Sequence, residues 1–355
     1  MFKGSVASPD LAEVVGALKG VAEPTRLRLL ALLGHGEMTV GEICSVLDQS
    51  QPRISRHLRL LTEQGLLDRF REQQCVYYRV PVSGRPLAWA RQIQALIDPE
   101  APVLRRDRER AARVIGDRAR LAARQLLAAD GAGPGVAEAG VAAAAASDAA
   151  EAVDPAAGDA RRAGLSAALF EELGPVGVGE LLDIGTGSGL MLEILGPRAG
   201  HAMGVDISAP ALRLARTRVH GAGLSHCEFR RGDMYQLPFD DGRFDTVTMD
   251  CVLATAAQPA VAVAEAARTL KPGGQLILVE DFDQIGIHAA AGVAAGQAGG
   301  GAAERPAAAG RVGAAVAANP LAVLRGWLAR AGLAAGRLRP VDLQTQHLIV
   351  AFARR

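Results

Sequence analysis

The sequence contains few cysteines and no apolar run long enough to cross a membrane. Its four cysteines, Cys44, Cys75, Cys227 and Cys251, are scattered over 355 residues, which argues against a disulfide framework. Its longest apolar segments are interrupted by Gly, Arg or Asp well before the length of a membrane-spanning helix. The opening residues, MFKGSVASPD, lack the charged and then apolar pattern of a signal peptide. These absences predict a soluble, cytoplasmic protein.

Length and charge indicate two domains with different partners. A chain of 355 residues suits two domains of ordinary size, and 49% of the residues are hydrophobic, although many of these are alanine. The net charge of +1 is unevenly distributed, because residues 1–127 carry 20 Lys and Arg side chains against 14 acidic ones. A basic first third is typical of a protein that binds nucleic acid, although many basic surfaces bind nothing in particular.

Three zones follow one another along the chain. Residues 10–98 alternate short helical patterns with one hairpin. An Arg-rich helical pattern at 104–127 leads into an Ala/Gly-rich segment, which we interpret as a linker or loose helix because it has too few large apolar side chains to form a core. From residue 165 onward, strand-like and helical segments alternate, which predicts a parallel sheet wrapped by helices. A second Ala/Gly-rich tract occupies 289–310.

The segment 24–80 has the pattern helix, helix, turn, helix and hairpin. In LDQSQPRISRHLRLL, Ser50 can cap the third helix and Pro52 suits its first turn. Its apolar residues at helical spacing are Ile54, Leu58 and Leu61. The opposite side of this helix is polar and basic, as expected for a helix that lies in the major groove of DNA.

Candidate DNA contacts lie on this helix and on the hairpin that follows. They are Ser50, Gln51, Arg53, Ser55, Arg56 and Arg59 on the helix and Arg69, Arg71 and Arg79 on the hairpin. Gln51, Arg53 and Arg56 are the expected contacts to bases or their neighbourhood, and Arg59 is an expected phosphate contact. The alternative is an ordinary amphipathic helix with a solvated basic face, which the whole pattern disfavours.

Residues 10–98 resemble the ArsR/SmtB family of winged-helix repressors, through LDQSQPRISRHLRLLTEQGLL and the hairpin ending VYYRV. The resemblance implies an α+β winged helix–turn–helix domain. It also implies a homodimer joined mainly through the terminal helices, here at about 11–18 and 87–97. Such a dimer binds an inverted repeat in double-stranded DNA and leaves it when an effector binds.

Metal sensing is not expected. The family often binds metal through a C-x-C-x-x-C set before the recognition helix, and the matching positions here are Thr39, Gly41 and Cys44. One thiolate cannot hold a soft metal that requires three or four ligands. The helix LAWARQIQALI also lacks the Asp and His residues of the family's zinc site. We interpret Cys44 as a small buried residue.

The segment ELLDIGTGSGL predicts a strand, a glycine loop and the start of a helix. Gly185, Gly187 and Gly189 allow the backbone to turn tightly and to approach a ligand. Asp183 ends the strand, where its carboxylate can accept hydrogen bonds from an ammonium group or from loop amides. Because Leu190 follows the third glycine, the spacing departs from the G-x-G-x-x-G pattern of NAD-binding proteins.

Acidic residues follow at the ends of the next strands. Asp206 comes 17 residues after the last glycine and can bind both ribose hydroxyls, with Ile207 beside it. Asp233 can accept a hydrogen bond from an adenine amine, and Met234 can lie on the ring. Asp250 ends a fourth strand. Each residue alone suits an ordinary cap or turn, but their order along alternating strands predicts a nucleoside pocket.

Residues 165–355 resemble class I S-adenosylmethionine-dependent methyltransferases, through LLDIGTGSG, GVDIS, GDMYQLPF, FDTVTMD and LKPGG. The resemblance implies a doubly wound α/β domain with a seven-stranded, mostly parallel sheet that ends in a hairpin. It implies S-adenosylmethionine (SAM) or S-adenosylhomocysteine (SAH) as the bound nucleoside. Asp183 and the three glycines would surround its methionine end. The expected domains are therefore 1–100, a helix and linker at 101–164, and 165–355.

The segments that would bind the methyl acceptor in such an enzyme depart from the family pattern in this sequence. ARRAGLSAALFEEL has Phe170 as its one aromatic residue where fused relatives carry an aromatic lid, and an Ala/Gly tract follows EDFDQIGIH. We therefore predict a repressor whose second domain binds SAM or SAH as effector. The alternative is an active methyltransferase on a small molecule, with no catalytic residue assigned. Arsenic methylation is less expected, because only Cys227 and Cys251 are available.

The helix at 104–127 is a candidate for coupling the domains, although its mixed charges also suit a solvated helix.

Overall fold

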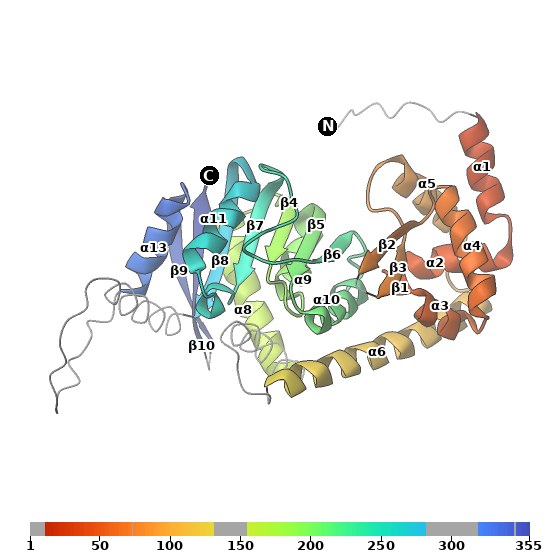
Figure 1. The fold of residues 1–355 in the computed structure, drawn as a ribbon, viewed down its shortest axis with the longest axis horizontal. Coiled ribbons are helices and arrows are strands. Elements are labelled where there is room, and N and C mark those ends of the chain that lie inside the picture. The colour runs from red at the N-terminus through yellow and green to blue at the C-terminus, as the bar shows by residue number, and fades with distance from the viewer. Residues whose placement is uncertain (1–10, 73, 131–154, 282–318, 344–345) are drawn as a thin grey trace, which may run out of the picture.

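The computed structural model describes residues 11–72, 74–130, 155–281, 319–343 and 346–355. They form a small N-terminal domain, a long helix and a larger C-terminal domain built on a seven-stranded sheet (Figure 1). The multidomain fold predicted from the sequence is confirmed. The tract at 289–310 and most of the expected linker lie outside the described residues.

The N-terminal domain has the expected order of helix, helix, turn, helix and hairpin. Its elements are α1 (Leu11–Val21), α2 (Pro24–Leu33), β1 (Met38–Thr39), α3 (Val40–Leu47), α4 (Gln51–Glu63), β2 (Asp68–Glu72), β3 (Cys75–Arg79) and α5 (Gly84–Ala95). A capping box starts α3: the Thr39 hydroxyl accepts from the Glu42 amide, and the Glu42 carboxylate accepts from the Thr39 amide. The hairpin strand β3 pairs antiparallel with both β2 and β1. The β2–β3 hairpin, which is the wing of this domain, is therefore tied to the start of α3.

Apolar residues at helical spacing hold α4 in this domain. Ile54, Leu58 and Leu61 have no exposed surface and pack in one core with residues of α2 and α3. Burying each such side chain stabilises the fold by about 2 kcal/mol. The buried stripe fixes the rotation of α4 about its own axis, which turns its polar side outward.

The long helix α6 (Pro102–Asp130) contacts both domains. It has 29 residues, which corresponds to a length of about 43 Å. Its first half packs on α2 and α3, where Asp107 pairs with Arg28 at 2.7 Å, and its second half packs on the C-terminal domain (Figure 1). The helix predicted at 104–127 is therefore present. No helix among the described residues has the length and apolar character to span a membrane.

The C-terminal domain alternates helices and strands. Its helices and strands are α8 (Pro155–Leu173), β4 (Gly179–Ile184), α9 (Leu190–Leu195), η1 (Gly196–Arg198), β5 (Ala199–Asp206), α10 (Ala209–Gly221), β6 (Cys227–Arg231), β7 (Phe244–Asp250), η2 (Leu253–Thr255), α11 (Pro259–Thr269), β8 (Leu270–Asp281), α13 (Pro320–Arg330), β9 (Ala334–Leu343) and β10 (Gln346–Arg354). The sheet order is β6-β5-β4-β7-β8-β10-β9. The first five strands are parallel, and β10 runs antiparallel to both neighbours. The strand order reverses at β4, which is where open α/β sheets bind ligands.

One part of the expected linker is helical. Helix α8 begins at Pro155, within the Ala/Gly-rich segment that the sequence interpretation treated as a linker or loose helix. Alanine is the strongest helix former, and Leu165, Ala168 and Leu169 are buried against the sheet. The small alanine side chains gave this helix a weak apolar pattern, so its start was missed.

Candidate functional site

The glycine loop between β4 and α9 has a conformation that requires glycine. Gly185, Gly187 and Gly189 have φ angles of 67°, 50° and 87°, in the left-handed region that side chains disfavour. A Cβ at Gly185 would lie 2.5 Å from a methyl group of Val252, and one at Gly189 would lie 2.8 Å from a methyl group of Val219. The three glycines therefore present main-chain atoms, with no side chains over them, at the carboxyl end of β4.

Asp206 connects this loop to the end of the neighbouring strand β5. One oxygen of its carboxylate accepts from the Gly187 amide at 3.0 Å and the other from the Ser208 amide at 2.7 Å. Burial raises the pKa of Asp206, against these hydrogen bonds. The Ser208 hydroxyl in turn accepts from the Ala211 amide and caps α10. Asp206 therefore lies between the glycine loop and the first turn of α10.

Asp183 is more enclosed than the sequence suggested. Only 1% of its surface is exposed, and its carboxylate accepts from the Thr186 hydroxyl at 2.7 Å and the Thr248 hydroxyl at 2.6 Å. Burial raises its pKa to about 7. Its partners in this structure are thus two hydroxyl groups, where an ammonium group or loop amides were expected. Asp183 ties β4 to β7 beneath the loop.

Asp250, at the end of β7, pairs with an arginine that sequence reasoning missed. Arg161 of α8 is buried and donates to the Asp250 carboxylate at 2.7 Å and to the Cys251 sulfur at 3.4 Å. Cys251 has a φ of 54°, and burial raises the pKa of its thiol well above 9.0. Arg161 lies in an alanine-rich segment with no local motif, so no sequence signal identified it.

Glu280, near the end of β8, is a second missed residue. Its carboxylate has no exposed surface and accepts from the amides of Val252, Leu253 and Ala254 at 3.1, 2.7 and 3.3 Å. Burial raises its pKa to about 8. Glu280 thereby fixes the loop after β7. A strand-end glutamate was the available signal, in the segment LILVED.

The remaining predicted pocket residues lie at the ends of β5 and β6. Asp233 is exposed and accepts from the Tyr235 amide at 2.9 Å, which is the ordinary role of an Asp in a turn. Met234 is partly buried against the core, and Ile207 is 45% exposed. All three are accessible to a ligand at this edge of the sheet.

Carboxylates predominate at this edge. Asp183, Asp206, Asp250 and Glu280 end four adjacent strands, and Arg161 is the cation that pairs with one of them. Because burial raises the pKa of Asp183 to about 7 and that of Glu280 to about 8, this edge carries only part of that negative charge at neutral pH, and it suits a ligand with hydrogen-bond donors or a positive group. SAM has an ammonium and a sulfonium group, and the side-chain-free glycine loop gives room for its methionine part. The residues present therefore fit an adenosyl ligand.

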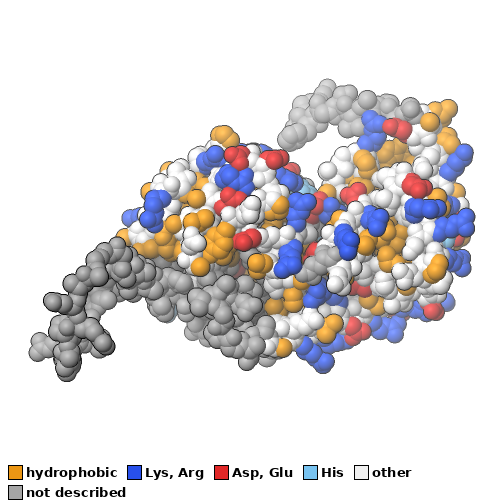
Figure 2. Space-filling model, in the orientation of Figure 1, with side chains coloured by type: hydrophobic (Ala, Val, Ile, Leu, Met, Phe, Trp, Pro, Cys, Tyr) orange, Lys and Arg blue, Asp and Glu red, His pale blue; other side chains and the backbone are white. Residues whose placement is uncertain are grey.

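The polar side of α4 is presented to solvent. Gln51, Arg53, Arg56 and Arg59 are exposed and Ser55 is partly buried. Ser50 is the N-cap residue, but its side chain makes no capping hydrogen bond. Arg59 lies 3.6 Å from Glu63 on the same helix. Basic side chains are spread over the outer side of this domain (Figure 2), so α4 is accessible to a nucleic acid.

The wing presents two of its three arginines. Arg69 and Arg71 are exposed on β2. Arg79 was expected to grip the DNA backbone, but its side chain is 16% exposed and pairs with Glu228 of the C-terminal domain at 2.8 Å. Side chains alternate along a strand, and the face of the wing that carries Arg79 lies on the other domain. Nothing in the sequence indicated that the wing packs on the C-terminal domain.

The expected metal-sensing positions are occupied by other contacts. The Thr39 hydroxyl takes part in the capping box of α3, and Cys44 is partly buried beside the core. Among the described residues, no three His, Cys, Asp or Glu side chains are grouped as metal ligands.

Comparisons with known proteins find two different families in the two parts of the chain. Residues 23–69 match the model of bacterial regulatory proteins of the arsR family, and residues 182–278 match a methyltransferase domain model. The arsenical resistance operon repressor of Escherichia coli is 47% identical over 76 residues, which are 21% of this chain and 63% of the repressor. A demethylmenaquinone methyltransferase of Clavibacter sepedonicus is 34% identical over 113 residues, 32% of this chain and 45% of that enzyme.

This chain joins an ArsR-type DNA-binding domain to a methyltransferase domain. The chain spans between about a third and two thirds of the length of the first curated relatives it matches. A SAM-dependent methyltransferase from Aquifex aeolicus is 18% identical to it, with a TM-score of 0.39, over 53% of this chain and 88% of that structure.

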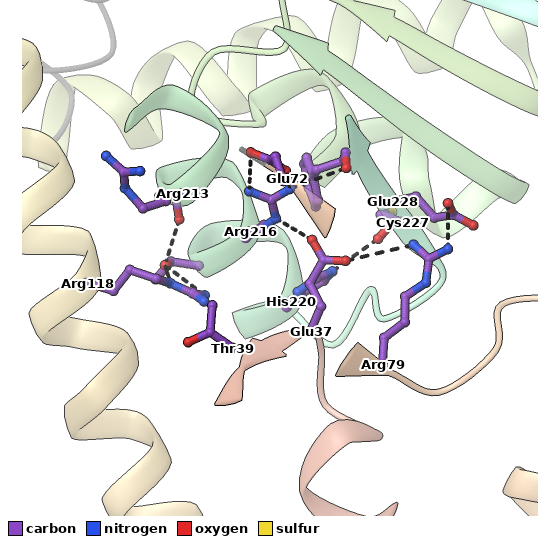
Figure 3. A network of polar contacts seen from close by, with 12 residues as sticks. Glu37, Thr39, Glu72, Arg79, Arg118, Arg213, Arg216, His220, Cys227 and Glu228 are labelled. Atoms are coloured by element: carbon purple, nitrogen blue, oxygen red, sulfur yellow. Dashed lines mark hydrogen bonds and ion pairs between the residues drawn. The ribbon is translucent and has the colours of Figure 1, made fainter. Parts of the chain in front are cut away.

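The ArsR-type domain and the methyltransferase domain are joined by a buried ionic network (Figure 3). Arg216 of α10 has no exposed surface, and its guanidinium donates to the carboxylates of Glu37 and Glu72. The same guanidinium lies 4.7 Å from the ring centre of Tyr77 on β3. Glu37, Glu72 and Tyr77 all belong to the ArsR-type domain. Arg216 is therefore enclosed by the other domain's wing.

A second set of contacts joins α6 to both domains. Arg118 of α6 donates to Glu42 of the ArsR-type domain at 3.2 Å and to the Thr217 hydroxyl of the methyltransferase domain at 3.4 Å. Its side chain is 8% exposed. Charge pairs that are removed from water hold their geometry more firmly than exposed pairs. The wing, α6 and α10 thus form the interface between the two domains, which we call the joint.

Proposed function

We propose that this protein is a DNA-binding transcriptional regulator whose methyltransferase domain binds SAM or SAH as an effector. The proposed form is a homodimer that represses by binding an inverted repeat. Binding of the adenosyl ligand changes the affinity of the ArsR-type domain for DNA.

The DNA-binding part of the proposal is supported by α4. Its apolar stripe is buried and its basic side is exposed, which is the arrangement that a recognition helix requires. Arg53 and Arg56 stand on its leading turns and Arg69 and Arg71 on the wing. The helix supplies base contacts and the wing supplies phosphate contacts.

The ligand-binding part is supported by the edge of the sheet at β4. The glycine loop excludes side chains, Asp206 spans the loop and the start of α10, and carboxylates predominate. A ribose that binds Asp206 competes with the Gly187 and Ser208 amides for the same carboxylate. Ligand binding therefore acts on the first turn of α10.

Helix α10 is the observation that carries the proposal. It begins three residues after Asp206, and Arg216 and Thr217, in its second half, contact the ArsR-type domain and α6. A helix is stiff, so a shift at its first turn is transmitted to the joint. The effector site and the wing are thus connected through one helix of 13 residues, in which Arg216 is the eighth. A change in the joint alters how the wing is held on DNA.

The test measures DNA binding by the full chain with and without ligand. A DNA site selected from a random pool is titrated by fluorescence anisotropy, at fixed salt, in the absence and presence of saturating SAM or SAH. We expect one of them to change the dissociation constant about tenfold, since allosteric coupling is commonly worth 1–3 kcal/mol. Equal affinity under all three conditions contradicts the proposal.

Two variants separate the two sites. Asp206→Ala should abolish SAH binding in calorimetry while DNA affinity without ligand is retained. Arg56→Ala should weaken DNA binding by about 1–3 kcal/mol and leave SAH binding intact. Unchanged SAH binding by Asp206→Ala would contradict the ribose assignment. Transfer of a labelled methyl group from SAM to a small molecule would favour the enzyme over the sensor.

A further inference from the structure

One turn in the second half of α10 lies between the glycine loop and the ArsR-type domain. Residues three and four positions apart share a face of a helix, so Ala215, Arg218 and Val219 lie on one face of this turn. Arg216 and His220 lie on another face. The first face contacts the glycine loop and the start of α9, and the second contacts the ArsR-type domain. This turn therefore touches both the adenosyl site and the joint.

The first face is packed directly on the glycine loop. A Cβ placed on Gly189 would lie 2.8 Å from a methyl group of Val219 and 3.2 Å from both Cα and Cβ of Ala215. The main chain of the loop thus rests on the helix with no free space between them. Close-packed contacts have low compressibility and transmit displacements. A shift of the loop at Gly189 therefore also moves this turn of α10.

Arg218 adds a polar connection on the same face. Its Nη1 donates to the Ser188 hydroxyl at 3.2 Å, and its Nε donates to the carboxylate of Glu193 in the first turn of α9. Ser188 lies within the glycine loop and is 7% exposed. The planar guanidinium of an arginine fixes the directions of its partners. Arg218 therefore holds the glycine loop and the start of α9 against α10.

The ArsR-type domain supports the same turn from the other side. Arg216 and Glu37 point toward one another across the joint, with His220 beside them (Figure 3). A Cβ on Gly36, between α2 and β1, would lie 2.5 Å from Nδ1 of His220 and 2.8 Å from its Cβ. His220 is 9% exposed, and its Nε2 lies 3.1 Å from the carbonyl oxygen of Cys227, which holds the ring in place. The two domains therefore meet at this turn without free space.

Such support orders the glycine loop before a ligand arrives. A ligand that must order a loop on binding loses affinity, and a loop that is already ordered avoids this cost. With the ArsR-type domain docked, the helix is held against Gly189, and Arg218 holds Ser188. When the ArsR-type domain leaves this turn, the loop loses that support. Because linkage is reciprocal, a ligand that favours the ordered loop also strengthens the docking.

We propose that docking of the ArsR-type domain raises the affinity of the glycine loop for the adenosyl ligand, and that Arg218 is the positioning residue that carries this effect. The inference rests on the adenosyl binding of the proposed function, but not on DNA binding. It acts at the turn that carries Arg216, whereas the route through Asp206 acts at the first turn of α10. The docked and undocked arrangements are thus two states with different ligand affinities.

The test is a cycle of SAH affinities, measured by calorimetry on the full chain without DNA. Gly36→Ala places a methyl group against His220 and should force the ArsR-type domain off the turn. We expect it to weaken SAH binding about tenfold, within the usual range of allosteric coupling. Arg218→Gln should weaken binding by a similar factor, and the double variant should bind SAH no more weakly than Arg218→Gln alone. Unchanged affinity of Gly36→Ala, or effects that multiply in the double variant, overturns the proposal.

Two matched controls accompany the cycle. Gly65 has a φ of 66°, and a Cβ there would meet no atom within 4 Å, so Gly65→Ala isolates the strain of alanine at a positive φ. Arg213, also on α10, donates to Gln125 of α6, so Arg213→Gln removes an arginine from the same helix. Both variants should bind SAH as the native chain does. Thermal unfolding checks that every variant is folded.

Glu72→Gln replaces Gly36→Ala if the latter does not fold. It removes one carboxylate partner of Arg216 and lies in the wing, in the other domain from the glycine loop. It should weaken SAH binding in the native background and have no effect in the Arg218→Gln background. Equal SAH affinity of Glu72→Gln and the native chain overturns the proposal. Failure of the proposed regulation appears in a different measurement, as a DNA affinity that does not change with ligand while this cycle holds.

Discussion

Arg216 is a charged residue whose side chain is buried away from water. Its guanidinium is fully buried at the joint, and the carboxylates of Glu37 and Glu72 compensate its charge. Burial of a charge is tolerated only with such partners. The joint therefore depends on three charges from three separate segments of the chain.

Replacing Arg216 with Met should lower the free energy of unfolding by about 3–5 kcal/mol, because it removes the buried cation that Glu37 and Glu72 share. Urea denaturation followed by circular dichroism measures the change. Arg213→Met, on the same helix where Arg213 donates to Gln125, is the control and should change stability by less than about 1 kcal/mol. Adding Glu37→Gln and Glu72→Gln to Arg216→Met should restore part of the loss. Equal stabilities of Arg216→Met and Arg213→Met would contradict this account.

Gly189→Ala should destabilise the protein more than Gly174→Ala. Both glycines have a positive φ, of 87° and 58°, but the new Cβ at Gly189 meets Val219 at 2.8 Å, and the one at Gly174 meets nothing within 4 Å. The left-handed backbone alone costs about 1–2 kcal/mol, which the Gly174 variant isolates. Thermal or chemical unfolding of both variants gives the difference. If the two losses are equal, the close approach at Gly189 has no energetic consequence.

Residues were predictable from the sequence where a local motif surrounds them. Gly185, Gly187 and Asp206 could be named because a strand, a loop and a helix follow in fixed order. Arg161 and Arg216 could not, because each is one arginine among many and its role depends on a distant carboxylate. Assigning Arg79 to DNA was wrong for the same reason: its partner is Glu228, in the other domain.

At the scale of elements, α1 and α5 carry apolar side chains that the monomer leaves exposed. Leu11, Leu18 and Leu96 are 79%, 52% and 84% exposed, and they lie on or beside the helices that the resemblance assigns to a dimer interface. The proposed homodimer would cover these side chains.

The double variant Leu11→Glu and Leu18→Glu should be monomeric and should bind an inverted-repeat DNA much more weakly, because each half-site would be bound independently. Light scattering after size exclusion gives the mass. Leu121→Glu, at a 57% exposed position on α6, is the control and should stay dimeric. A dimeric double variant would place the interface elsewhere.

Three strands meet at His201, and this contact should make stability depend on pH. Burial lowers the pKa of His201, but hydrogen bonds and charges of Glu228 and Glu180 outweigh it and raise the pKa above 6.5. A raised pKa means that the stabilisation is complete below the unfolded value of 6.5 and is lost as pH rises through the folded value.

The stability difference between the native protein and His201→Gln should therefore be largest at about pH 6 and shrink toward about pH 9. Urea denaturation across this range measures it. Because the pKa of Glu228 is lowered, its own contribution is lost only at acidic pH and does not affect this range. A difference that stays constant with pH would contradict the raised pKa of His201.

Elements were predictable where their side-chain pattern was strong. The five parallel strands were found because apolar runs alternate with helical segments, whereas the final hairpin was expected only from the resemblance to class I methyltransferases. The start of α8 was missed, because alanine buries little area and its pattern resembles that of a linker.

For the whole molecule, the order of the two domains followed from their motifs, but their relative placement did not. The joint depends on contacts between residues up to 179 positions apart, as in the pair of Arg216 and Glu37. No periodicity in either domain encodes such a contact. The consequence is that the proposed regulation is a property of the joined chain and cannot be seen in either half.

The long helix α6 determines where this protein can be divided. Its Asp107 neutralises Arg28, and Leu104 and Ala111 are buried against the first domain. A gene fragment that stops at codon 100 would therefore encode a DNA-binding half with an unneutralised arginine and an open hydrophobic side, prone to aggregate during expression. Ending the fragment at Asp130 retains the half of α6 that covers the first domain, but its second half would then lose the methyltransferase domain on which it packs.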